Sequence, residues 1–227
     1  MNPTVRQMIG LIDSDIAPWD LAEPWDNCGL IAGHPDWPVK KVMVGLDADM
    51  PLLEAARQWQ VDMVLTHHPL FITPVKTIDF SVMPGSAIVL AATKKIAVVC
   101  AHTNLDKAAD GLNDDLARRL QIQPTRFLAP DTDAVIPGGY PAGLGRVGKV
   151  SEPVSLARMA DQIKRHLGVN PVRVVGNTGM KIREAAVCSG SGGSLIPAFL
   201  ASEADVYITG DIKYHEARLI ESQGRAL

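Results

Sequence analysis

An internal repeat relates two segments of the 227-residue chain that lie 143 positions apart. Equivalent positions carry the same residue: Val44 and Val187, Leu52 and Leu195, Asp62 and Asp205, Thr66 and Thr209. In the first copy, apolar runs at 40–49 and 61–66 flank a helical pattern at 51–60, which predicts a strand, a helix and a strand. Such a βαβ unit joins parallel strands. The repeat therefore predicts two related α/β halves.

Further helical and apolar patterns complete each half. Helical spacing occurs at 4–16, 86–95, 112–122, 154–167 and 214–223, and an apolar strand pattern occurs at 96–103. We expect a loop at 104–111, and the segment 121–143, rich in Pro, Gly and Asp, is expected to cross between the halves. The sequence thus predicts an α/β protein with mixed sheets, divided into 1–125 and 126–227.

The second half reaches only part of the repeated pattern. The helix expected at 214–223 is followed by the residues GRAL, which correspond to the start of the strand at 96–103. The sequence ends there, at Leu227. We therefore expect the second half to lack its last strand.

Composition and charge argue against several classes of protein. The chain has 22 Lys and Arg residues against 25 Asp and Glu residues, a net charge of −3, and 5% aromatic residues. It therefore lacks the basic surface and the stacking side chains that nucleic-acid-binding proteins use. Three scattered cysteines without a CxxC pair indicate a reducing compartment. There is no signal-peptide pattern and no apolar run of about 20 residues, so we expect a cytoplasmic protein without a membrane span.

Two adjacent histidines are the first candidates for a functional site. His67 and His68 directly follow the apolar run at 61–66, so both imidazoles are expected at the carboxyl end of a sheet, where α/β folds place their sites. Successive strand residues point in opposite directions, which favours two metal ions over one. The alternative is a pair of exposed loop histidines before Pro69.

A second group of polar residues follows the strand at 96–103. The Asp106 carboxylate could reach the same crevice and bridge two cations, or it could instead form an Asx turn or cap a helix. His102, Thr103 and Asn104 are candidates to orient ligands or to face a substrate. His102 could equally be a core residue.

Glycine-rich motifs offer weaker signals. Ser189 and Gly190 lie in CSGSGG, where backbone amides between a strand and a helix could hold an anion or simply form a tight turn. GLGRVG matches GxGxxG by letter, but no clear strand precedes it, which argues against a dinucleotide site.

Remaining polar motifs have an ordinary structural interpretation beside a functional one. YHEARL is not HExxH, so His215 is expected on a helix surface or beside a site. In EPWDNCGL, Trp25 could wall a pocket. Asp26 and Asn27 could support the site or face a substrate, or they could simply form a turn. Cys100 and Cys188 lie in apolar strands, where free cysteine acts as a small apolar residue.

Taken together, the motifs PWDNCGL, VLTHHPLF, AHTNLDKAADGLN, GLGRVG, VCSGSGGSLI and TGDIKYHEA resemble, in this order, the Nif-three-like dinuclear metal family of GTP cyclohydrolase I type 2 homologues. The resemblance covers nearly the whole chain. It implies two similar α/β domains, a site for two divalent ions such as Zn, Fe or Mn at the crevice between them, and a toroidal homohexamer built as a trimer of dimers. His67, His68 and Asp106 match metal ligands of the family.

The resemblance also implies that part of the ligand set is absent. The family pattern continues into a Gly-His motif and a Glu ligand, and this sequence stops before them. Two histidines and one bridging aspartate would give each ion only two protein ligands, below the three usual in a catalytic zinc site. His102, Asp211 and His215 are the nearest substitutes, and we expect incomplete loading with two ions.

Two functions of different class follow from this resemblance. The first is a metal-dependent hydrolase for a nucleotide or a related phosphorylated small molecule, in which a metal-activated water attacks and the glycine-rich turn or Arg146 lies near phosphate. The second is a non-catalytic, metal-binding hexameric scaffold or interaction protein.

Overall fold

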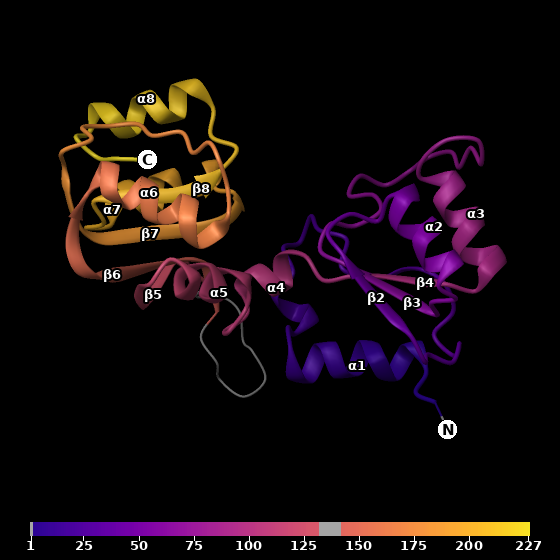
Figure 1. Cartoon of the computed structure of the whole chain (residues 1–227). Coiled ribbons are helices and arrows are strands. Elements are labelled where there is room, and N and C mark those ends of the chain that lie inside the picture. The colour runs from indigo at the N-terminus through magenta and orange to yellow at the C-terminus, as the bar shows by residue number, and fades with distance from the viewer. Residues whose placement is uncertain (1, 132–141) are drawn as a thin grey trace. The chain divides into compact units, whose positions relative to one another are not determined.

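The computed structural model describes residues 2–131 and 142–227. The chain forms two compact units, Met1–Leu105 and Asp106–Leu227 (Figure 1). The sequence placed this boundary at 125/126. The second unit begins earlier because the helix at 112–119 packs against the second sheet and the strand at 122–130 is part of that sheet.

The first unit contains a four-stranded mixed sheet and its helices. In chain order these are α1 (Val5–Asp15), η1 (Trp19–Leu21), β1 (Gly29–Ala32), β2 (Val42–Gly45), α2 (Met50–Gln58), β3 (Met63–Thr66), α3 (Gly85–Lys94), β4 (Ala97–Cys100) and the start of α4 (Thr103–Lys107). The strand order is β1-β4-β3-β2. Strands β2, β3 and β4 are parallel, and β1 pairs antiparallel with β4.

Alternating side chains of β3 and β4 bury both faces of this sheet. Val64 and Val98 pack with residues of α2 and α3 on one face. Met63 and Val99 pack with residues of α1 on the other. Because both faces are covered, these strands appear in the sequence as continuous apolar runs, as is typical of parallel sheets.

The second unit is also built on a four-stranded mixed sheet. Its elements are α5 (Leu112–Arg119), β5 (Ile122–Pro130), β6 (Gly143–Ser155), α6 (Leu156–Leu167), β7 (Lys181–Ser191), η2 (Gly193–Leu195), α7 (Ile196–Ala201), β8 (Val206–Gly210) and α8 (Tyr214–Ser222). The strand order is β5-β6-β7-β8, and only β7 and β8 are parallel. Residues of α5 and α6 share one apolar core, and residues of α7 and α8 share the other. The predicted α/β class with mixed sheets is therefore confirmed.

The internal repeat is visible in the hydrogen bonds of both sheets. Asp62 accepts from the backbone amides of Lys40 and Lys41 at 2.7 and 2.9 Å. Asp205, 143 residues later, accepts in the same way from Arg183 and Glu184 at 2.7 and 3.0 Å. In each half the aspartate side chain thus accepts hydrogen bonds from the backbone of the neighbouring parallel strand or the residues just before it. This shared role explains why the aspartate occurs in both copies of the repeat.

Strand register repeats with the same offset. Val44 pairs with Leu65 in the first sheet, and the equivalent Val187 pairs with Ile208 in the second. A further contact recurs at a shorter offset: the amide of Ala97 donates to the carbonyl of Asp62, and the amide of Ala226 donates to that of Asp205. Ala226 also forms a parallel bridge with Val206. The last residues therefore begin a strand beside β8, as the repeat predicts.

Three elements differ from the sequence prediction. Helix α4 replaces the start of the loop expected at 104–111. Strand β1 lies between the helical pattern at 4–16 and the apolar run at 40–49, where no strand was predicted. Strand β5 occupies the start of the segment expected to cross between the halves. Both strands are sheet edges whose stability comes from pairing with β4 and β6, which local patterns do not reveal. Residues 132–141 of that expected crossing lie outside the described residues. Among the described helices, none is long and apolar enough to cross a membrane.

Close contact between β5 and β6 depends on a glycine. Gly148 lies opposite Pro124, and a Cβ at this position would overlap the carbonyl group of Gln123. Gly148→Ala is therefore expected to lower the free energy of unfolding by about 2 kcal/mol, because the strands must separate. Gly10→Ala, on α1 with open space around it, should instead raise it by about 0.5–1 kcal/mol. Urea unfolding of both variants checks this contrast, and equal effects would contradict it.

Candidate metal centre

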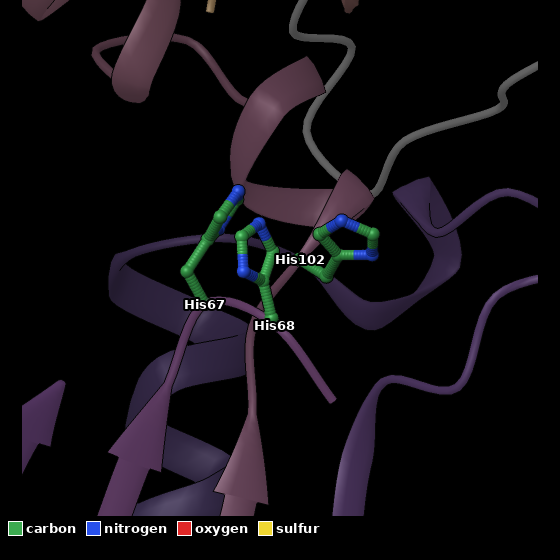
Figure 2. Close-up of side chains that lie close together, drawn as sticks. All are labelled: His67, His68 and His102. Atoms are coloured by element: carbon green, nitrogen blue, oxygen red, sulfur yellow. The ribbon is translucent and has the colours of Figure 1, made fainter. Parts of the chain in front are cut away.

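Three imidazoles converge at the carboxyl ends of β3 and β4. His67 and His68 follow β3, and His102 follows β4 (Figure 2). Ring centroids are 5.1 Å apart for His67 and His68, 4.9 Å for His67 and His102, and 5.6 Å for His68 and His102. One nitrogen from each ring lies within 4.8 Å of the others. Among residues 2–131 and 142–227, this histidine cluster is the only group of three or more His, Cys, Asp or Glu side chains close enough to hold one metal ion.

The two consecutive histidines converge because the strand has already ended. Strand β3 stops at Thr66, whose hydroxyl donates to the carbonyl of His68 at 2.8 Å. The amides of His67 and His68 donate to carbonyls of Gly45 and Leu46 at 3.3 and 2.8 Å. This bent backbone removes the strict alternation of a strand. The prediction that the two imidazoles point in opposite directions is therefore wrong.

Each ring of the histidine cluster is held through its Nδ1 atom. The acceptors are the Ala101 carbonyl for His67 at 3.1 Å, Asp47 for His68 at 2.8 Å, and Asp26 for His102 at 2.9 Å. Because each partner is an oxygen acceptor, Nδ1 carries the proton in the neutral ring and Nε2 carries the lone pair. Metal-binding histidines are oriented by hydrogen bonds of this kind.

Asp26 is the most strongly bound of these acceptors. Its side chain is fully buried, whereas that of Asp47 is 57% exposed. It accepts from the Thr103 amide at 3.0 Å, from the Thr103 hydroxyl and from the Cys28 thiol at 3.1 Å. Burial alone raises the pKa of Asp26, but hydrogen bonds from His102, Thr103 and Cys28 outweigh it and hold the pKa well below its usual range. The sequence left two roles open for Asp26, a turn or a group beside the site, and the hydrogen bond to His102 places it beside the histidine cluster.

Other residues named from the sequence lie around the same edge. Trp25 is exposed and meets His102 edge-on, with ring centroids 6.3 Å apart. The Asn27 side chain donates to the Phe71 carbonyl at 2.8 Å. Thr103 is buried against Asp26, so it supports the site rather than facing a substrate. Asn104 is also buried, and its amide group donates to the Ala17 carbonyl at 2.9 Å. Its side chain therefore does not face solvent, where a substrate would bind.

Asp106 belongs to the second unit and contacts the glycine-rich segment there. The Ser189 hydroxyl donates to the Asp106 carboxylate at 3.0 Å, and the Ser189 amide donates to the Asn113 side chain at 2.8 Å. Asn113 also donates to the Asp106 carbonyl at 2.9 Å, a role that no sequence motif indicated. Since the Ser189 amide already has a partner, it is not available for the anion suggested by the sequence. Asp106 as a metal ligand stays a prediction.

Three further candidates lie at the same end of the second sheet. Gly190, with φ of +66°, is still within β7, and its carbonyl accepts from the Thr209 hydroxyl at 3.1 Å. Asp211 follows β8 with φ of +51°. His215 lies in the first turn of α8, where its ring meets that of Tyr214. The role of Asp211 and His215 as substitute metal ligands also stays a prediction.

Arg146 does not serve as a phosphate ligand. Its side chain is 3% exposed and donates to the Asp114 carboxylate at 2.7 and 2.8 Å. Its other donors bind the carbonyls of Gly143, Gly145 and Ala108 at 2.9–3.0 Å. All five N–H groups of a guanidinium are thus used within the second unit. The expectation that Arg146 lies near a bound phosphate is therefore wrong, because this arginine is buried in an ion pair with Asp114 rather than exposed as a free cation.

The histidine cluster fits a divalent metal ion by its donor set. Three neutral imidazoles with a further position for water are a common catalytic zinc arrangement. Imidazole also suits iron, and manganese prefers more oxygen ligands. The cluster by itself accounts for one ion, and a second ion stays a prediction.

The chain is similar to a widespread group of proteins. Residues 3–227 match the sequence profile of the Duf34/NIF3 (NGG1p interacting factor 3) family. A GTP cyclohydrolase 1 type 2 homologue of Clostridium acetobutylicum is 32% identical over 95% of this chain and 78% of its own length. The Helicobacter pylori protein described as GTP cyclohydrolase 1 type 2 is 31% identical over 98% of this chain and 83% of its own.

Solved structures show the same fold. The Bacillus cereus protein related to NIF3 superposes with a TM-score of 0.90 at 26% identity, covering 100% of this chain and 87% of that chain. Reduced HcgD from Methanocaldococcus jannaschii superposes with a TM-score of 0.82 at 31% identity, covering 100% and 86%.

Proposed function

This chain belongs to the Duf34/NIF3 family, and on that basis we propose that it is a metal-dependent hydrolase acting on a nucleotide or a related phosphorylated molecule. One observation carries the proposal: three imidazoles, each held by a hydrogen bond from Nδ1 to an oxygen acceptor, bring one nitrogen each within 4.8 Å of the others. The description of the Helicobacter pylori relative as a GTP cyclohydrolase 1 type 2 supports GTP as the first substrate to test.

The residues of the centre have distinct roles in this proposal. His67, His68 and His102 bind the ion, and Asp26 and Asp47 hold two of the rings in the required tautomer. A bound divalent ion supplies a water of lowered pKa and a Lewis acid for the group under attack. The exposed face of Trp25 beside His102 offers a surface on which a purine can stack. We also propose that Asp106 helps to hold a second ion, as the family resemblance implies.

Product formation tests the proposal directly. Protein loaded separately with Zn²⁺, Mn²⁺ or Fe²⁺ is incubated with GTP, and both the ring-opened formamide and formate are measured, since one water opens the imidazole ring of guanine and a second releases C8 as formate. Phosphate release from nucleoside triphosphates is measured in parallel. The proposal expects metal-dependent product that is absent in His68→Ala and kept in His34→Ala, an exposed histidine outside the cluster. Fully loaded protein that forms none of these products would contradict the hydrolase.

A second candidate function is a non-catalytic metal-binding scaffold that assembles with itself. An apolar segment between β3 and α3 supports it, because large apolar side chains are exposed there: Ile72, Val75, Ile78, Phe80, Val82 and Met83. Exposed apolar side chains concentrated in one segment are typical of interaction surfaces. The scaffold is favoured over the enzyme if cells need the assembled protein but tolerate loss of the histidine cluster.

The assembly that we propose is a homohexamer built as a trimer of dimers. Chains of 24.4 kDa would give a particle of about 146 kDa, and light scattering at micromolar concentration should detect it. Replacing Phe80 and Val82 by serine should reduce the mass, because both side chains are more than half exposed and apolar. Leu11→Ser, at a 49% exposed position on α1, is the matched control and should leave the mass unchanged. A wild-type protein that remains monomeric would contradict the hexamer.

A further inference from the structure

Two of the three free cysteines lie in contact within the first unit. Strand β1 pairs with β4 so that Gly29 is the direct partner of Cys100, and Cys28 immediately precedes Gly29. The thiols of Cys28 and Cys100 are close enough to interact with each other. Cys188, the third cysteine, lies in β7 of the other unit. In the proposed metal-binding and hydrolase roles, neither thiol is a metal ligand or a reacting group.

Backbone geometry at the thiol pair suits a disulfide. Directly paired residues of antiparallel strands have Cα atoms about 4.5–5.5 Å apart, so a residue one position along lies roughly 6 Å away. This is within the range of about 4.4–6.8 Å found across disulfides. In a regular strand, Cys28 would point to the opposite face from Cys100. Gly29 has φ of +93°, a conformation that favours glycine, and it breaks this alternation.

The two cysteines differ in access to solvent. Cys28 is half-buried, so a small oxidant can reach it, whereas Cys100 is fully buried. A reactive thiol next to a protected partner is the arrangement in which an oxidised sulfur is captured as a disulfide before it oxidises further. The difference therefore assigns the first step to Cys28 and the second to Cys100.

We propose that Cys28 and Cys100 form a reversible disulfide when the protein meets a hydroperoxide. The Cys28 sulfur attacks one oxygen of hydrogen peroxide, the O–O bond breaks, and Cys28 becomes a sulfenic acid as one water leaves. The Cys100 sulfur then attacks the Cys28 sulfur, the S–O bond breaks, and the oxygen leaves as a second water with the thiol proton. Two thiols thus lose two electrons and two protons, which reduce one peroxide to two waters.

The disulfide would also change the support of the histidine cluster. The Cys28 thiol donates to Asp26 at 3.1 Å, and the Cys100 thiol donates to the His67 carbonyl at 3.0 Å. Oxidation removes both donors. Since Asp26 orients His102, we expect zinc affinity to fall about tenfold, the lower end of the effect of altering groups behind metal ligands. This consequence rests on the proposed metal centre, whereas disulfide formation does not.

Thiol counting on metal-free protein tests the disulfide. Equimolar hydrogen peroxide is expected to reduce the thiols titrated under denaturing conditions from three to one, to lower the chain mass by about 2 Da, and to yield one peptide pair linking Cys28 to Cys100. Dithiothreitol should restore all three thiols. Three remaining thiols, a link between chains, or Cys28 oxidised to a sulfinic acid without a disulfide would overturn the proposal.

Two variants sharpen the result. Cys188→Ser should lose both of its remaining thiols on oxidation, because the reactive pair is intact. Cys28→Ser should keep both thiols and show no 2 Da loss, and its circular dichroism spectrum checks that it folds. The peptide map of the wild type decides the question if the variant does not fold.

Zinc affinity of reduced and oxidised protein separates the two proposals. A tenfold loss on oxidation, reversed by dithiothreitol, supports the coupling between the disulfide and the histidine cluster. An unchanged affinity with a formed disulfide overturns the coupling alone. Reduced protein that binds no zinc contradicts the metal centre, while the thiol count still decides the disulfide.

Discussion

His102→Ala is expected to weaken zinc binding at least about 100-fold, because losing even a group behind a metal ligand weakens binding by roughly 10–100-fold. The wild-type protein should keep about one equivalent of zinc per chain after dialysis against metal-free buffer, since the histidine cluster offers the three protein ligands typical of such sites. A second equivalent should be lost. Elemental analysis and competition with a chelator measure both quantities.

The variant His34→Ala is the matched control for this experiment. The His34 side chain is 57% exposed, and it lies in the first unit outside the cluster, so His34→Ala should bind zinc as the wild type does. Equal affinity of His102→Ala and wild type would contradict the three-histidine centre. Two tightly held equivalents would instead mean that Asp106, Asp211 or His215 completes a second site.

Asp26→Ala is expected to lower the free energy of unfolding of the metal-free protein by about 3 kcal/mol. The carboxylate is fully buried, and its removal leaves donors of His102, Thr103 and Cys28 without their acceptor. Zinc affinity should fall by about 10–100-fold, because His102 loses its orienting partner. Chemical denaturation and zinc titration test the two effects separately.

The exposed Asp47 provides the comparison. It accepts from His68 as Asp26 does from His102, but its side chain is 57% exposed, and pairs of this kind contribute less than about 1 kcal/mol. Asp47→Ala should therefore leave stability almost unchanged. A loss equal to that of Asp26→Ala would show that burial of Asp26 is not the cause.

Acid should reduce the difference between wild type and Asp26→Ala. The folded-state pKa of Asp26 is lowered, so the stability that it contributes is present above the unfolded-state pKa of about 4 and is lost as the pH falls below it. Unfolding free energies measured between pH 6 and pH 3 should move closer together, and the difference should disappear only below the lowered folded-state pKa. A constant difference over this range would contradict a stabilising ionised carboxylate.

Much of the fold follows from patterns that the sequence carries locally. Strands β3 and β4 are buried on both faces and appear as apolar runs, and α1 begins where Thr4 and Gln7 form a capping box. Edge strands β1 and β5 were not predicted, because their place is decided by pairing with β4 and β6 rather than by their own residues.

Sequence and tertiary structure determined different parts of this protein. The sequence by itself determined the two α/β halves and the recurring aspartates, because Asp62 and Asp205 act on neighbouring strand starts in the same way. It also placed His67 and His68 at a strand end. Only the tertiary structure decided that His102 joins them, that Asp26 is their buried support and that Cys28 meets Cys100. These contacts join residues 34 to 76 positions apart in the sequence. Contacts over such separations are set by strand pairing and burial, which local residue patterns do not encode.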